Sequence, residues 1–265
     1  MSDWLHALPV VWMALMVFGA TYLVAAGIYF AVSRLAAGGR ARSFKAVSPG
    51  MLPPLGIVFG LFVAFIAAQV WNDNERAEAA VNREASALRT AVVLSSDFAE
   101  AGERLRRLIR AHIKKETIIE EWPKLAHQSA TLSFTPPFLA QALQLTLSLT
   151  PDNDGQRVAQ REIAAAIGNA FDARLQRIII SRSQVNAVKW ACLILQAICA
   201  LTAIAMVHSD DRLSAAITMT IFATGIRASV LLIAAHDRPF VGEIAVGPGP
   251  LHEVMPESVP VEKRS

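Results

Sequence analysis

Residues 55–88 read LGIVFGLFVAFIAAQVWNDNERAEAAVNREASAL, and this stretch decides the fold. The chain is apolar from residue 51 to Trp71, which at a rise of about 1.5 Å per residue is enough to cross a hydrocarbon core of about 30 Å. The residues after Trp71 carry charges around apolar positions at helical intervals. Because no turn signal separates the two parts, the sequence predicts that a membrane-spanning helix continues outside the membrane.

Three other segments are equally apolar. Residues 7–33 and 190–207 contain no Asp, Glu, Lys, Arg or His, and residues 213–235 contain only Arg227. The whole chain is 54% hydrophobic and 18% charged, whereas an ordinary globular protein is about a quarter charged. The start of the chain lacks the basic region of a secretory signal. The sequence therefore predicts an all-α membrane protein with four transmembrane helices, at residues 8–32, 51–71, 189–207 and 213–235.

The remaining residues predict a helical extramembrane domain inserted between spans two and three, at residues 72–188. A helical pattern runs to Trp122 with Gly102 as its weak point, and another resumes at Gln156 and runs into span three. We expect a long antiparallel hairpin continuous with both spans, capped by shorter helices. Residues 33–50 are a basic loop, and residues 236–265 are a juxtamembrane motif followed by a Pro/Gly-rich tail whose end is expected to be disordered.

Motifs of enzymes are absent from the sequence. It has no zinc-ligand spacing, no phosphate-binding glycine loop and no serine in a glycine-flanked elbow. We therefore expect no enzymatic activity, no cofactor, no metal and no nucleic-acid partner. Cys192 and Cys199 lie seven residues apart in span three, where they act as small apolar residues. The expected partners are the lipid bilayer, further copies of the chain and a permeant ion.

Span two carries two candidate faces. One is a stripe of small residues that lets helices approach closely: Gly56, Gly60, Ala64 and Ala68. The other is a large apolar face, which would form a hydrophobic constriction if the helix lined a pore: Phe59, Phe62, Val63 and Ile66. Plain packing within the membrane explains the small stripe equally well, so the sequence leaves both interpretations open.

Two features near span four carry charge. Arg227 lies inside the span, where burial costs about 2.5–3.5 kcal/mol, so it should face a bundle interior, a partner or water. It either snorkels toward the end of the span or supplies a fixed positive charge beside an ion path. The motif His236, Asp237 and Arg238 follows the span. Its members are either interfacial residues or a lock against Arg76, Glu78 or Glu84, whose stretch otherwise looks like a solvated helix face.

The sequence resembles the bacterial bestrophin-like domain family. The resemblance rests on GLFVAF at residues 60–65, NREASAL at 82–88, MVHSDDR at 206–212 and HDRPFVGEI at 236–244, with Pro248, Pro250 and Leu251. It implies a distant similarity to bestrophins, which are pentameric anion channels with two spans, a cytoplasmic helical domain and two further spans. Their second span lines a hydrophobic neck. No dense acidic cluster follows span four here, so the resemblance does not extend to calcium gating.

The leading functional hypothesis is a homo-oligomeric, anion-permeable channel in a bacterial inner membrane, pentameric if it follows the resemblance, with span two lining a hydrophobic constriction. The alternative is a membrane-tethered helical sensor or scaffold without a pore. Basic residues near the span ends favour a cytoplasmic helical domain, since about eight lie beside the domain and about five on the loop side.

Overall fold

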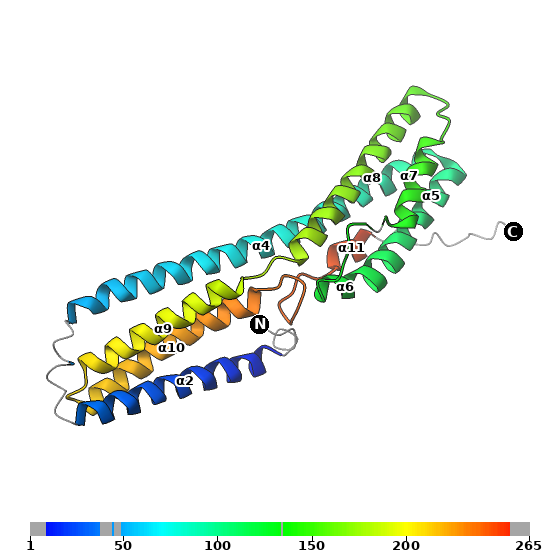
Figure 1. Ribbon diagram of the computed structural model, residues 1–265. Coiled ribbons are helices and arrows are strands. Elements are labelled where there is room, and N and C mark those ends of the chain that lie inside the picture. The colour runs from blue at the N-terminus through cyan, green and yellow to red at the C-terminus, as the bar shows by residue number, and fades with distance from the viewer. Residues whose placement is uncertain (1–8, 38–43, 45–48, 134, 255–265) are drawn as a thin grey trace. The chain divides into compact units, whose positions relative to one another are not determined.

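The structure is a computed structural model that describes residues 9–37, 44, 49–133 and 135–254. In this part of the chain all regular secondary structure is helical (Figure 1). The chain divides into two compact units. We call Met1–Asn72 with Gln184–Ala245 the membrane unit, and Asp73–Ser183 with Val246–Ser265 the helical domain.

The membrane unit contains α2 (Val10–Leu35), the first part of α4 (Leu52–Leu94), α9 (Ala187–Val207) and α10 (Arg212–His236). These four helices, side by side in Figure 1, are each long and apolar enough to cross a membrane. They confirm the predicted class, an all-α membrane protein with four spans. A short 3-10 helix, η2 (Pro49–Met51), precedes α4, and the Asp211 carboxylate caps α10 by accepting from the Leu213 and Ser214 amides.

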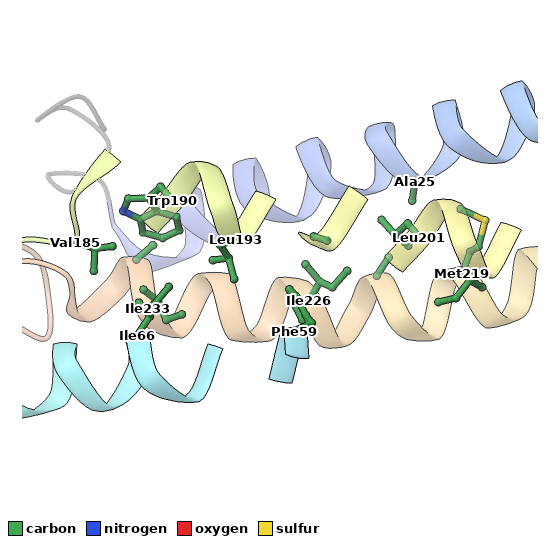
Figure 2. Packing of buried hydrophobic residues seen from close by; sticks show 14 of the residues in the cluster. Ala25, Phe59, Ile66, Val185, Trp190, Leu193, Leu201, Met219, Ile226 and Ile233 are labelled. Atoms are coloured by element: carbon green, nitrogen blue, oxygen red, sulfur yellow. The ribbon is translucent and has the colours of Figure 1, made fainter. Parts of the chain in front are cut away.

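Apolar side chains from all four helices fill the centre of the membrane unit. Figure 2 shows Phe59 and Ile66 of α4 beside Ile226 and Ile233 of α10. Members of this core buried below a tenth of their surface include Met13, Ala25, Leu193, Leu201 and Met219. Such close packing makes this core apolar; Arg227, also buried in the membrane unit, is the exception described below.

The helical domain contains the rest of α4 and six helices that follow it in sequence: η3 (Ser95–Asp97), α5 (Ala99–Ala111), η4 (His112–Glu121), α6 (Trp122–Ala126), α7 (Pro137–Leu147) and α8 (Asp154–Ser181). Element η4 is a π-helix. Helix α7 packs against α5 and α8. The N-terminus of α8 is capped by the Asn153 side chain, which accepts from the Gln156 amide at 2.9 Å.

The prediction of one helix from span two to Trp122 is wrong. Helix α4 does pass from the membrane unit into the helical domain, but it ends at Leu94. The Ser95 and Ser96 hydroxyls donate to the Val92 and Val93 carbonyls, at 2.6 and 2.7 Å. Such local bonds compete with a continuing helix. Gly102 then allows α5 to start, because a Cβ at this position would lie 1.9 Å from the Ser95 carbonyl oxygen.

The predicted continuity into span three is also wrong. Helix α8 ends at Ser181 and α9 begins at Ala187, so the chain is not helical between them. The Asn186 side chain caps α9 by accepting from the Val188 amide at 2.6 Å. Side-chain caps of this kind favour a new helix start over continuation.

The C-terminal segment is more ordered than its composition indicates. A short helix, α11 (Gly249–Val254), buries Leu251 and Val254 within the helical domain. The expected disorder at the end of the tail concerns residues 255–265, which lie outside the described residues. Most of the basic loop, including Arg40, Arg42 and Lys45, also lies outside them.

Candidate functional site

The predicted constriction residues of span two face the core of their own subunit. Phe59 and Ile66 are buried in the apolar core, and Phe62 and Val63 pack against it (Figure 2). The Phe59 ring lies 6.1 Å from the Phe222 ring of α10, centroid to centroid. Phe59 and Ile66 are thus enclosed within the membrane unit, while Phe62 and Val63 are half-buried.

The opposite face of α4 is not covered by any of the described residues. Ile57, Leu61 and Phe65, spaced four residues apart, are 68%, 54% and 66% exposed. The small stripe lies on the same side, since Gly60, Ala64 and Ala68 are exposed and Gly56 is half-buried. A Cβ added at Gly56 or Gly60 would meet no atom within 4 Å. Among the described residues, the exposed part of the stripe, at Gly60, Ala64 and Ala68, therefore has no helix packed on it.

Arg227 lies inside the membrane unit and is 0% exposed. Its guanidinium carbon lies 3.0 Å from the Tyr22 ring centroid and 4.5 Å from that of Phe18, both on α2. Its Nε donates to the Ala223 carbonyl at 3.0 Å, and one Nη donates to the Thr224 hydroxyl at 2.8 Å. None of these contacts involves a carboxylate. The two aromatic rings therefore stabilise the positive charge of Arg227 without neutralising it.

Segment Asp237–Phe240, after span four, is buried and contacts the break before α9. One Asp237 carboxylate oxygen accepts from the Val185 amide at 2.6 Å. Arg238 donates to the Gln184 side chain at 3.4 Å, while the ring of His236 contacts the Leu232 carbonyl at 3.0 Å. A buried carboxylate on a backbone amide is a strong hydrogen bond, so this part of the motif fixes how the chain enters span three.

The helical domain contains a buried ionic network that sequence reasoning missed. It consists of all the buried ionisable residues in the described part of this domain, joined in the order Arg174, Glu121, Arg177, Glu84, His112 and Glu116. We call these six residues the buried network. They come from α4, η4 and α8, three elements distant in sequence.

Arg177 is the centre of the buried network and is 0% exposed. One guanidinium nitrogen lies 2.5 Å from a Glu121 oxygen, and another lies 3.2 Å from a Glu84 oxygen. The guanidinium also lies over the Trp122 ring, at 5.2 Å from its centroid. Arg174 donates from Nε to the second Glu121 oxygen at 2.7 Å. Arg177 therefore bridges η4 and α4 from its place on α8.

His112 is enclosed by two carboxylates at the other end of the buried network. Its Nδ1 lies 2.6 Å from Glu116, and its Nε2 lies 3.7 Å from Glu84. Glu116 is held in place because its other oxygen accepts from the Phe138 amide of α7 at 2.7 Å. Burial lowers the pKa of His112, but the Glu116 and Glu84 carboxylates outweigh it and raise the pKa above 6.5.

The sequence contained a signal for this network. Glu84 is in helical register with Val81 and Leu88, which are both buried. It was interpreted as part of a solvated face, but its place on the apolar stripe indicated burial. Arg174 has the same register with Phe171 and Ile178. What the sequence did not reveal is which of these charged residues meet.

The described residues contain no group of three or more His, Cys, Asp and Glu side chains that could hold a metal ion. Both cysteines are free. Three features of the described residues therefore remain as candidates for function. They are the Arg227 cation in the membrane unit, the exposed apolar face of α4 and the buried network of the helical domain.

Comparisons with known proteins agree on one family. The family model of the bestrophin-like domain matches residues 19–251. No curated protein matches the chain. Among solved structures, the fold is similar to two mutant forms of a bacterial bestrophin homologue from Klebsiella pneumoniae, at 12% and 10% sequence identity. The TM-scores are 0.65 and 0.66, with 91% of this chain covered and 96% and 97% of those chains. The chain thus belongs to the bestrophin-like domain family.

Proposed function

We propose that the protein is a homo-oligomeric ion channel whose pore lies between subunits. The observation that carries this proposal is the uncovered face of α4, with Ile57, Leu61 and Phe65 one turn apart. The interior of one membrane unit is filled by apolar side chains, so a water path needs several copies around an axis. A groove of about 390 Å³ between α2, α9 and α10 is lined almost wholly by apolar side chains and offers no ion path.

The free face of α4 suits both tasks that a pore helix has. Gly60 and Ala64 let a neighbouring helix approach closely, while the larger side chains at Ile57, Leu61 and Phe65 would meet their counterparts around an axis. A ring of such side chains is a hydrophobic constriction that controls ion passage by dewetting. This proposal replaces the sequence-based choice of Phe59, Phe62, Val63 and Ile66. The number of subunits, five, is taken from the family resemblance given under the sequence analysis.

Anions are the proposed permeant ions. Arg227 contributes a permanent positive charge to the membrane unit, and its contacts with Ala223, Thr224, Phe18 and Tyr22 do not neutralise it. In a medium of low dielectric constant, such a charge raises the local concentration of anions and lowers that of cations. Arg227 acts through its field, because its side chain is enclosed within the subunit.

Flux through reconstituted vesicles tests this proposal. We expect the wild-type protein to carry chloride faster than sodium, because of the Arg227 charge. Leu61→Ala and Phe65→Ala should each raise the chloride flux several-fold, since a wider, less apolar ring is easier to wet. Phe62→Ala is the matched control, because Phe62 packs against the subunit core, and it should leave the flux near the wild-type value.

Native mass spectrometry of each variant shows whether the assembly is preserved. A wild-type protein that stays monomeric in mild detergents and carries no ion would exclude the channel and favour the sensor or scaffold. An increase with Phe62→Ala alone would return the constriction to the face that the sequence first indicated.

The proposed location is a bacterial inner membrane with the helical domain in the cytoplasm. The support is the excess of basic residues where that domain joins the spans, such as Arg76, Arg83 and Lys189. After Cys192 and Cys199 are replaced by Ser, single cysteines at Asp152 and Asp210 mark the two sides. An impermeant thiol reagent added to intact cells is expected to label the Asp210 position and not the Asp152 position, and the reverse pattern would invert the topology.

A further inference from the structure

The charge of the buried network depends on one proton. Glu84, Glu116 and Glu121 contribute three negative charges, and Arg174 and Arg177 contribute two fixed positive charges. The network is therefore neutral only when His112 is an imidazolium. A neutral His112 leaves one carboxylate charge without compensation, and an uncompensated buried charge is strongly unfavourable. With all three carboxylates ionised, charge balance therefore favours the protonated form of His112 in the folded domain.

The positions of the two carboxylates favour the same form. Carboxylates face both ring nitrogens of His112, Glu116 at 2.6 Å from Nδ1 and Glu84 at 3.7 Å from Nε2. Only an imidazolium carries a proton on both nitrogens, whereas a neutral ring donates from one and presents a lone pair at the other. The Thr117 hydroxyl, 3.4 Å from Nε2, could donate to that lone pair, but it would supply no positive charge to Glu84.

Glu84 is the group that depends most on this charge. It is 0% exposed, and neither of its oxygens accepts a hydrogen bond of good geometry from the described residues. Its ion-pair contacts are Arg177 of α8 and His112 of η4. Glu116 differs, because the Phe138 amide also stabilises it. Loss of the His112 proton therefore weakens mainly the contact between His112 of η4 and Glu84 of α4.

We infer that His112 is a proton-operated clamp, whose imidazolium holds η4 against Glu84 of α4 and whose deprotonation releases that contact. The π-helical form of η4 suits such an element, because π-helical turns are rare and occur often at functional sites. The clamp belongs to the helical domain and does not depend on the proposed pore.

The direction of its pH dependence follows from linkage. The carboxylates raise the pKa of folded His112 above its ordinary value of 6.5. A raised pKa stabilises the fold fully below the unfolded pKa, and this contribution is lost as the pH rises through the folded pKa. The clamp is therefore closed below pH 6.5, and it opens as the pH rises through the folded pKa of His112, which lies above 6.5.

Hydrogen exchange of the full-length protein in detergent tests the clamp, with mass spectrometry of peptides that cover η4. After correction for intrinsic exchange, we expect the protection of η4 to fall as the pH is raised from about 6 to about 9. The fall should be roughly tenfold for each pH unit by which the folded pKa exceeds the unfolded one. Exchange at the imidazole C2 carbon, read in the same way, reports the titration midpoint of His112, which should lie above the ordinary value of 6.5.

Two variants separate the clamp from general alkaline unfolding. In His112→Gln, the backbone amides of η4 should exchange rapidly at every pH, as they do in the wild type at high pH. In His127→Gln, the dependence of η4 exchange on pH should be that of the wild type. If His112→Gln does not fold, Glu116→Gln provides the same test, because loss of that carboxylate should move the transition to lower pH. A wild-type η4 whose protection is independent of pH, or a His112 midpoint at or below 6.5, would overturn the inference.

Discussion

Replacement of Arg177 by Met is expected to loosen the helical domain more than any other single change considered for this protein. Arg177 is 0% exposed and contacts the carboxylates of Glu84 and Glu121. Removing one partner of a buried ion pair leaves an uncompensated charge and costs about 3–5 kcal/mol. Hydrogen exchange in α8 and η4 should therefore accelerate by a factor on the order of 10² to 10⁴.

Two further variants show whether the lost charge is the cause. Arg157→Met removes an arginine from the same helix, but its pair with Asp154 is exposed, so the change should cost less than about 1 kcal/mol. The double variant Glu84→Gln, Arg177→Met removes one charge of each sign and should recover part of the protection. If Arg177→Met were as mild as Arg157→Met, the buried network would contribute little to stability.

Gly102→Ala is expected to have the second largest effect, because it blocks the corner at which the chain leaves α4. A Cβ at Gly102 would lie 1.9 Å from the Ser95 carbonyl oxygen, and backbone atoms cannot move aside as a side chain can. Overpacking of this kind costs about 3 kcal/mol or more. The measurement is hydrogen exchange of peptides from η3 and α5, compared with peptides from α9, which should not change.

Gly168→Ala is the matched control in α8. A Cβ there meets no atom within 4 Å, so the substitution should stabilise the helix by up to about 1 kcal/mol, following the helix propensities of Gly and Ala. Equal destabilisation by both changes would show that the Gly102 effect does not come from its contact with Ser95.

The membrane part of the fold could be predicted from the sequence because it follows from local composition. A segment without charged residues has few structures available in a bilayer, since its backbone must satisfy its own hydrogen bonds. The bounds of α2, α4, α9 and α10 accordingly start or end within a few residues of the predicted spans. The ends of the long helices could not be predicted in this way. Ser95, Ser96 and Asn186 suit a helix interior poorly, but the decisive contacts of Gly102 and Asp237 are with residues elsewhere in the chain.

The candidate site residues also divide into those that local sequence revealed and those that only helix packing revealed. Arg227 was recognised because a charge within an apolar span is conspicuous in any sequence, whereas its place between Phe18 and Tyr22 required helix packing. The face of α4 could not be chosen from the sequence, because both of its sides are apolar and small residues occur on each flank. Packing against Phe222 decided that Phe59 lies inside, and this left Leu61 and Phe65 outside.

By itself, the sequence determined that this chain crosses a membrane four times and carries a helical domain between spans two and three, because hydrophobicity and helical period act over neighbouring residues. Only the tertiary structure decided where the long helices break, which face of α4 is free and how the buried network is assembled. Its charges come from α4, η4 and α8, and each carboxylate and guanidinium is stable there only because its counter-charge is buried beside it. That pairing is a property of the packed helices, and no one segment of the sequence contains it.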